Sequence, residues 1–212
     1  MSPYNIYYQT LAETTIKNLQ KRQMEGYYCN TAKEAVEKAN SLLIDGATIS
    51  FGGSVTLQET GMLDSLRSNP GITLLDRDQA KSNDEKQAIF HKSFGADYYF
   101  MSSNAITADG KLVNIDGTGN RLAALIYGPK NVIILAGMNK VVKDEQDGLS
   151  RVRLTAAAPN AIRLNRKTPC AITGVCSDCL SLDCICNQII ITRRSGIEGR
   201  IKVILIGESY GY

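Results

Sequence analysis

The chain has 212 residues, of which 43% are hydrophobic and 21% charged, and its formal net charge at pH 7 is +3. This composition is typical of a globular domain, and it excludes disordered, collagen-like and coiled-coil chains. The net charge is too small to indicate nucleic-acid binding, and no apolar run approaches the roughly 20 residues that span a bilayer. We therefore expect one domain over residues 1–212, with no nucleic acid as a partner and no insertion into a membrane.

The first 20 residues lack the charged start, apolar stretch and small-residue cleavage site of a secretory signal, which predicts a cytoplasmic protein. Charge is spread unevenly along the chain. Basic residues outnumber acidic ones in residues 151–212, whereas acidic residues are slightly in excess before them. A basic, solvated face is the favoured interpretation, and an anionic ligand near the C-terminal third is the alternative.

Hydrophobic periodicity predicts an alternation of helices and strands. A helix over residues 5–24 comes first, and the capping box Thr31–Glu34 begins a second helix that ends at Gly46. The other expected strands are 47–51, 72–75, 96–101, 111–115, 131–137, 188–193 and 201–207, and the other expected helices are 56–67, 78–94, 120–127 and 146–158, the last closed by Pro159. This order predicts an α/β fold, with a mostly parallel sheet and helices on both faces.

The first candidate site is the loop between the strand at 47–51 and the next helix, with Gly52, Gly53, Ser54 and Thr56 as its ligand-binding residues. Glycines at such a position let backbone N–H groups approach an anion, although a plain structural turn fits the same residues. Glu59 lies three residues after Thr56. It is a candidate catalytic carboxylate, and capping of the helix is its favoured role.

The second candidate site is a set of polar residues near predicted strand ends, where open α/β sheets place their ligands. Each member alone fits a turn or a helix cap, such as a hairpin turn at residues 109–110. The density of the set favours a binding site, because loops at sheet ends carry function. Its members are Asp97, Asn104, Asp109, Asn114, Asp116, Asn120 and Arg121.

The third candidate site is a cysteine-rich loop over residues 168–187, within a long irregular segment. Its pattern contains one Cys-x2-Cys turn, whose two thiolates can point inward together, and further cysteines that can complete a site. Thiolate ligands suit zinc or an iron–sulfur cluster, and reduced thiols without metal are the alternative. The cysteines are Cys170, Cys176, Cys179, Cys184 and Cys186.

Three stretches together resemble the lactate-utilisation LUD-domain family: 51–61, 103–121 and the cysteine segment that ends at 187. The resemblance covers nearly the whole chain, and 104–121 is its most specific part. It implies the fold of glucosamine-6-phosphate deaminase, ribose-5-phosphate isomerase and coenzyme A transferases. Residues 95–97 and 117–118 are also similar to initiation-factor-2B-like sugar-phosphate isomerases, which implies an active-site role for Asp97.

The resemblance further implies a role in bacterial L-lactate oxidation, beside iron–sulfur oxidoreductase partners. Relatives of this length carry cysteines that match Cys170, Cys176, Cys179 and Cys186. At Cys184 many relatives have a basic residue, so this cysteine is either a spare thiol or an alternative ligand.

Three functional hypotheses follow, in order of preference. The first is an accessory or electron-transfer component of 2-hydroxy-acid oxidation that carries an iron–sulfur cluster. The second is an enzyme or sensor that binds a phosphorylated or coenzyme-A-like anion at the glycine loop, with Asp97 and Asp116 as acid/base groups and Arg121 pairing the anion. The third is a protein-interaction module stabilised by zinc.

Overall fold

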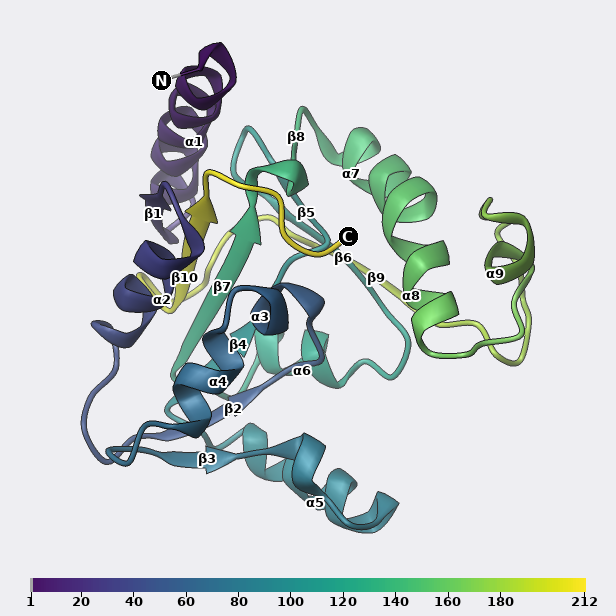
Figure 1. The fold of residues 1–212 in the computed structure, drawn as a ribbon, viewed down its shortest axis with the longest axis horizontal. Helices are drawn as coiled ribbons and strands as arrows, with labels where there is room; N and C mark the ends of the chain where they lie inside the picture. Colours follow the sequence, from purple (N-terminus) through teal and green to yellow (C-terminus); the bar gives the residue numbers. More distant parts are fainter. Residues whose placement is uncertain (1) are drawn as a thin grey trace.

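The computed structural model, which describes residues 2–212, is built on a six-stranded sheet (Figure 1). Every neighbouring pair of its strands runs parallel. The order across the sheet is β1 (Glu25–Cys29), β10 (Ile201–Ile206), β7 (Asn131–Gly137), β4 (Tyr98–Met101), β2 (Thr48–Phe51) and β3 (Thr73–Leu75). The expected α/β fold is thereby confirmed.

Helices cover both faces of this sheet because its central strands are buried on both sides. Along β7, Ile133 and Leu135 pack in one cluster of buried residues, while Val132 and Ile134 pack in another. The first cluster includes residues of α2 (Ala32–Asn40), α3 (Val55–Glu59) and α4 (Met62–Arg67), and the second includes residues of α1 (Pro3–Lys21) and α6 (Asn120–Ile126). A short η1 (Arg77–Gln79) and α5 (Asn83–Ser93) lie next to β2 and β3 at the edge.

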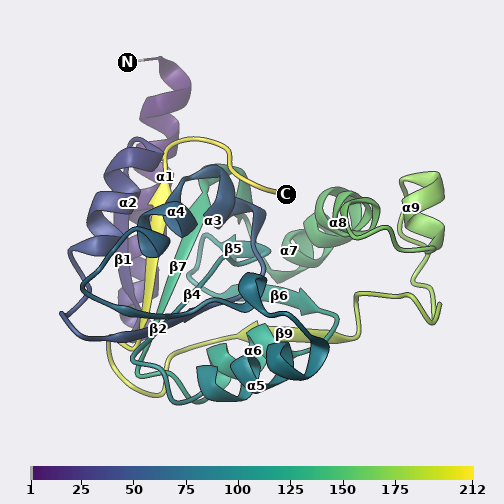
Figure 2. The ribbon, with the colours of Figure 1, turned by 60° about the horizontal axis from the view of Figure 1, so that its bottom comes forward.

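A second, mixed sheet of four strands extends the molecule (Figure 2). It was not predicted from the sequence. Its order is β8 (Val141–Val142), β5 (Ala105–Thr107), β6 (Leu112–Asp116) and β9 (Gln188–Thr192), and β6 pairs antiparallel with both of its neighbours. Helix α7 (Glu145–Arg151) packs on it so closely that a Cβ on Gly148 would lie 2.9 Å from Val113 Cγ2.

Several expected helices differ from the observed ones. The helix that begins after Thr31 ends at Asn40 rather than at Gly46, and the helix expected over 78–94 begins only at Asn83. The expected helix at 56–67 is broken into α3 and α4 by Gly61, whose φ is +77°. Pro159 does not end the helix expected at 146–158, which continues through a π-helical turn, η3 (Val152–Ala156), into α8 (Ala157–Arg163). Pro159 is tolerated because it lies in the first turn of α8, after the π-helical turn. At this position the missing N–H of proline costs no regular helical hydrogen bond.

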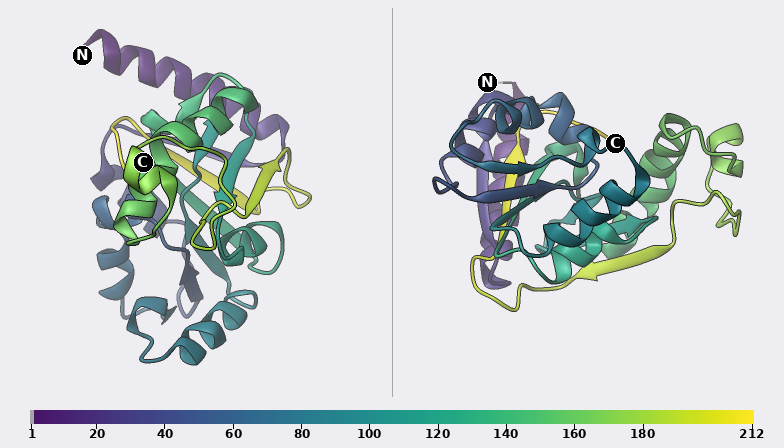
Figure 3. Two further views of the ribbon diagram at one scale, coloured as in Figure 1. Left: turned by 90° about the vertical axis from the view of Figure 1, so that its right-hand side faces the viewer. Right: turned by 90° about the horizontal axis from the view of Figure 1, so that it is seen from below.

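The cysteine-rich segment projects away from the parallel sheet, as Figures 1 and 3 show. It contains one short helix, α9 (Pro169–Thr173), and returns to the body of the molecule through β9. Within the described part of the chain, residues 2–212, no helix combines the length and apolar character needed to cross a membrane.

Candidate functional site

A cavity of about 220 Å³ lies at the carboxyl end of the parallel sheet. Segments that follow β2, β4, β6 and β7 form its walls, together with α8 and the last two residues of the chain. This is the edge at which α/β sheets place ligands. Five basic side chains and one acidic side chain line the cavity, namely Arg77, Arg121, Lys140, Arg163, Arg166 and Asp116. We call it the basic cavity.

The glycine loop forms one wall of the basic cavity. Gly52 is closely packed behind this wall, since a Cβ there would lie 3.0 Å from the Tyr99 hydroxyl and 3.1 Å from Arg121 Cγ. The Ser54 hydroxyl accepts a hydrogen bond from Leu57 N at 3.3 Å and caps α3. The expected cap of this helix at Thr56 and Glu59 is therefore wrong, and the Thr56 hydroxyl is left for another partner.

Arg121 is held in the cavity wall by five hydrogen bonds. Its Nε donates to Asp116 Oδ2 at 3.1 Å, and its terminal nitrogens donate to the side chains of Asn114 and Asn104 at 2.8 and 3.1 Å. The other two bonds go to the main-chain oxygens of Ser102 and Ile115. A guanidinium has five N–H donors, so Arg121 has none left over for an incoming anion.

Asp116 is also held by its neighbours, which donate one hydrogen bond to each of its carboxylate oxygens. Its second oxygen accepts from Gly119 N at 2.9 Å, at the turn where α6 begins. Its charge is neutralised by Arg121, so the remaining basic residues set the sign of the cavity. Asn104 and Asn120 lie in the wall with Asp116, whereas Asn114 is completely buried behind it.

In addition to Gly52 and Asn114, which do not line the cavity, three further expected site residues lie outside its wall. Asp97 precedes β4 at the opposite, amino end of the sheet, where it accepts from Lys130 Nζ at 2.8 Å and from Thr48 N at 2.9 Å. The hydrogen bond from Lys130 lowers the pKa of Asp97. Glu59 accepts from Gly211 N at 2.6 Å. The structure separates both carboxylates from the ligand-sized space.

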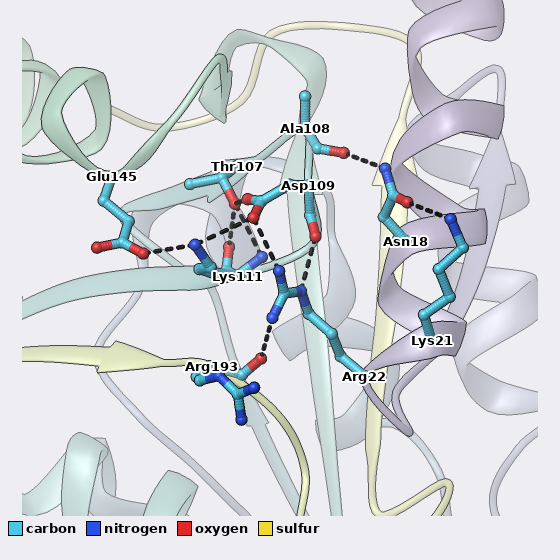
Figure 4. A network of polar contacts seen from close by, with 9 residues as sticks. All are labelled: Asn18, Lys21, Arg22, Thr107, Ala108, Asp109, Lys111, Glu145 and Arg193. Atoms are coloured by element: carbon cyan, nitrogen blue, oxygen red, sulfur yellow. Dashed lines mark hydrogen bonds and ion pairs between the residues drawn. The ribbon is translucent and has the colours of Figure 1, made fainter.

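The third residue outside the wall, Asp109, sits in the turn between β5 and β6 (Figure 4). Its carboxylate pairs with Arg22 at 2.8 Å and with Lys111 at 3.0 Å. In the same network Asn18 Nδ2 donates to Ala108 O at 2.9 Å. These contacts tie the hairpin to α1, as a structural turn does.

Lys140 also lines the cavity and was not predicted from the sequence. It is the last residue of η2 (Met138–Lys140), which follows β7 directly. Its side chain is 3% exposed and its Nζ donates to Thr56 Oγ1 at 2.8 Å and to Ser102 Oγ at 3.2 Å. Burial first, and then the positive charges of Arg151 and Arg121, lower the pKa of Lys140 to about 7, while Glu59 acts in the opposite direction. The only signal in the sequence was a lysine three residues after a strand with a continuous apolar run.

A second, smaller cavity of about 50 Å³ is lined by all five cysteines of the loop, and we call it the cysteine cavity. Burial and the neighbouring Cys184 and Cys176 raise the pKa of Cys186 to about 12. In residues 2–212 no three His, Cys, Asp or Glu side chains already stand in an arrangement that would hold a metal ion. The donor set, thiols that face one space, is nevertheless the chemistry that iron–sulfur clusters and zinc require.

The two cavities are neighbours. Ile115 and Ile185 line both of them. The backbone of Ile185 also packs against the loop of the basic cavity, since a Cβ on Gly117 would lie 3.2 Å from Ile185 Cα.

These features define an α/β protein with a basic cavity at the carboxyl end of a parallel sheet and a cysteine loop beside it. The chain belongs to the LUD domain family, whose family pattern matches residues 12–206. This family is associated with lactate utilisation.

One solved structure shows a similar fold. A DUF162 family protein from Deinococcus radiodurans is 13% identical, with a TM-score of 0.54, over 94% of this chain and 98% of that one. The likeness to eIF2B delta from Chaetomium thermophilum is partial, at 20% identity and a TM-score of 0.37, over 66% of this chain and 54% of that one. No curated protein matches the chain.

Proposed function

We propose that the protein binds a small organic anion in the basic cavity and acts in bacterial oxidation of L-lactate or another 2-hydroxy acid. The proposal that an anion binds rests on the charge of the cavity wall. Among residues 2–212, Asp116 is the only acidic side chain that lines this wall, and it is already paired with Arg121. The family membership supports the metabolic setting.

Arg77 is the arginine best placed to bind the anion. Its Nε is buried and has no hydrogen-bond partner within residues 2–212, and the nearest carboxylate oxygen, on Asp78, is 3.6 Å away. The guanidinium stacks on Phe90 and reaches the glycine loop, where Gly53 leaves room for it. Its Nη1 lies 3.4 Å from the Cβ position of Gly53 in the cavity wall, so the terminal nitrogens are placed to donate charge-assisted hydrogen bonds to a ligand oxygen.

The test measures thermal stabilisation by a panel of anions: L-lactate, pyruvate, a sugar phosphate, inorganic phosphate and coenzyme A. A ligand that binds the folded state alone raises the melting temperature. We expect at least one small anion to do so, and Arg77→Met to weaken its binding by about tenfold or more, as loss of a charged hydrogen bond implies. The control Arg193→Met removes an exposed arginine outside the wall and should leave binding intact. Absence of any shift across the panel would refute the proposal.

The second candidate function is electron transfer through an iron–sulfur cluster held by Cys170, Cys176, Cys179 and Cys186, with Cys184 as the alternative ligand. The observation that favours it is that five thiols line one cavity beside the anion site. Exposed apolar side chains on the same loop support a protein partner there, such as an iron–sulfur oxidoreductase. These are Ile172, Val175, Leu180 and Leu182.

This candidate is tested by iron, zinc and acid-labile sulfide content in protein purified without oxygen and without a metal-affinity tag. Iron and sulfide in equal amounts, lost in Cys186→Ser and kept in the control Cys29→Ser, support a cluster. Cys29 suits the control because it is buried in the core, away from the loop. Zinc without sulfide supports the interaction module instead, and absence of all three would leave only the anion site.

A further inference from the structure

We infer that Lys140 is a reactive amine that forms an imine with the carbonyl group of a small oxo acid bound in the basic cavity. This inference rests on the proposed function, because the oxo acid occupies the same cavity as the anion. It also makes the ligand class more specific, since a carbonyl is needed in addition to a carboxylate.

Lys140 is a buried lysine without a carboxylate partner among residues 2–212. It is 3% exposed, yet it lines the cavity at the carboxyl end of β7. A buried lysine normally has a carboxylate partner. No ion pair of residues 2–212 includes Lys140. The charged groups that act on it are instead Arg151 and Arg121, opposed by a smaller effect of Glu59.

Lys140 Nζ donates both of its hydrogen bonds to hydroxyl oxygens, those of Thr56 and Ser102. Thr56 donates its hydroxyl proton to Tyr210 O at 3.3 Å, and Ser102 donates its own to Ser103 O at 3.4 Å. Both hydroxyl oxygens are therefore acceptors toward Lys140. A neutral amine has two N–H groups and one lone pair, so two acceptors use both N–H groups and leave the lone pair unused.

The protonation state of Lys140 favours a nucleophilic role. Burial holds the pKa of Lys140 at about 7, against about 10.4 for a lysine in water. Near neutral pH a large share of Lys140 is thus the free amine, which is the nucleophilic form. Arg151 and Arg121 lower the pKa of Lys140 without offering the amine a proton acceptor, and the other basic side chains of the wall keep the cavity positive, which suits an anionic partner.

The reaction balances without an oxidant or a reductant. The lone pair of Nζ attacks the carbonyl carbon, and a proton passes from nitrogen to the former carbonyl oxygen, giving a carbinolamine. The carbon–oxygen bond then breaks, and the hydroxyl group leaves as water with one proton from the solvent. The product is a protonated imine, a cation whose neighbouring carboxylate Arg77 can bind.

The experiment traps the imine with cyanoborohydride, which supplies the hydride, and locates the adduct by peptide mass spectrometry. Pyruvate is the probe, L-lactate lacks the carbonyl, and acetone lacks the charge. We expect pyruvate to label Lys140 at pH 7 at least about tenfold faster than any exposed lysine, given the difference in free amine. L-lactate should give no adduct, and acetone should react more slowly at Lys140.

Two variants sharpen the result. Lys140→Met should remove the fast labelling, and the control Lys130→Met, which removes a lysine paired only at the surface, should keep it. The mapping of the adduct in wild-type protein shows whether Lys140 reacts even if Lys140→Met does not fold.

Labelling at Lys140 no faster than at Lys130 would overturn the inference. If anions bind through Arg77 but pyruvate leaves Lys140 unlabelled, this inference fails and the proposed function stands. If no anion binds, the proposed function has failed first.

Discussion

The guanidinium of Arg121 donates to Asn114 Oδ1 at 2.8 Å, and Asn114 is completely buried behind the wall of the basic cavity. Asn114 Oδ1 also accepts from Asn104 N at 3.2 Å. Two asparagines and Asp116 thus form a frame around one arginine. These contacts explain why the guanidinium charge of Arg121 is tolerated in the protein interior, because every N–H donor of Arg121 meets an acceptor.

Removal of Arg121 should therefore destabilise the fold. Arg121→Ala leaves the Asp116 carboxylate and two amide oxygens without their donor, and we expect the free energy of unfolding to fall by about 3–5 kcal/mol. Arg121→Lys should recover only part of this, since an ammonium group cannot reach five acceptors. Urea denaturation measures both. The exposed Arg193→Ala is the control, expected within about 0.5 kcal/mol of wild type, and an Arg121→Ala value in that range would contradict the prediction.

Asp97 gives a prediction of the opposite kind. It stands at the amino end of the sheet and pairs with the surface residue Lys130. We expect Asp97→Asn to leave thermal stabilisation by a bound anion unchanged, whereas Asp116→Asn, in the cavity wall, should alter it. If Asp97→Asn abolishes the stabilisation, the active-site role that the family resemblance implies for Asp97 would be supported despite its position.

The sequence predicted the elements that are continuous and deeply buried. Strand β7 was predicted with its observed bounds, since its apolar run is unbroken. Strand β1 was missed because it lies at the edge and is mostly half-buried, so Gly26, Tyr27 and Tyr28 show no periodic pattern. β5 was missed because it has three residues, too few for periodicity to appear.

The site was harder to predict because its parts are far apart in the chain. Asn104, Asp116 and Arg121 were found because they cluster in sequence. Lys140 was not, since its partner Thr56 is 84 residues away and its burial depends on packing that no local pattern records. An exposed lysine at a strand end would have looked the same in the sequence.

The turn at Gly110 is predicted to be critical for the packing of α1. Its φ is +88°, and a Cβ there would lie 2.7 Å from the backbone of Asn18 and Leu19. We expect Gly110→Ala to cost at least about 2 kcal/mol of unfolding free energy, from backbone strain and displacement of α1 together. Gly46 is the matched control, because its φ is +77° but nothing lies within 4 Å of its Cβ position. Gly46→Ala should cost only about 1 kcal/mol. Equal losses in chemical denaturation would show that the contact with α1 carries no weight.

Lys140 predicts a pH dependence of stability. Because its pKa is lowered to about 7 in the folded state from 10.5, the unfolded chain binds more protons between these values. The free energy of unfolding therefore rises with pH from about 7 to 10.5, because folded Lys140 is neutral there and no ammonium is buried. Below pH 7 folded Lys140 is protonated, and the full cost of burying an ammonium is present. Besides burial, the charged groups that shift the pKa of Lys140 are Arg151 and Arg121, which favour the neutral amine, and Glu59, which favours the ammonium.

The change is isolated by comparing wild type with Lys140→Met at each pH, because cysteines and tyrosines titrate in the same range and cancel in the difference. The wild-type protein should gain on the order of 3 kcal/mol relative to the variant between pH 7 and 10. The same comparison on Lys130→Met should give a nearly flat difference, or a small one of opposite sign, because the ion pair with Asp97 raises the pKa of Lys130. A flat difference for Lys140→Met would mean that the ammonium form is retained in the folded protein, and it would remove the basis for a nucleophilic amine in the basic cavity.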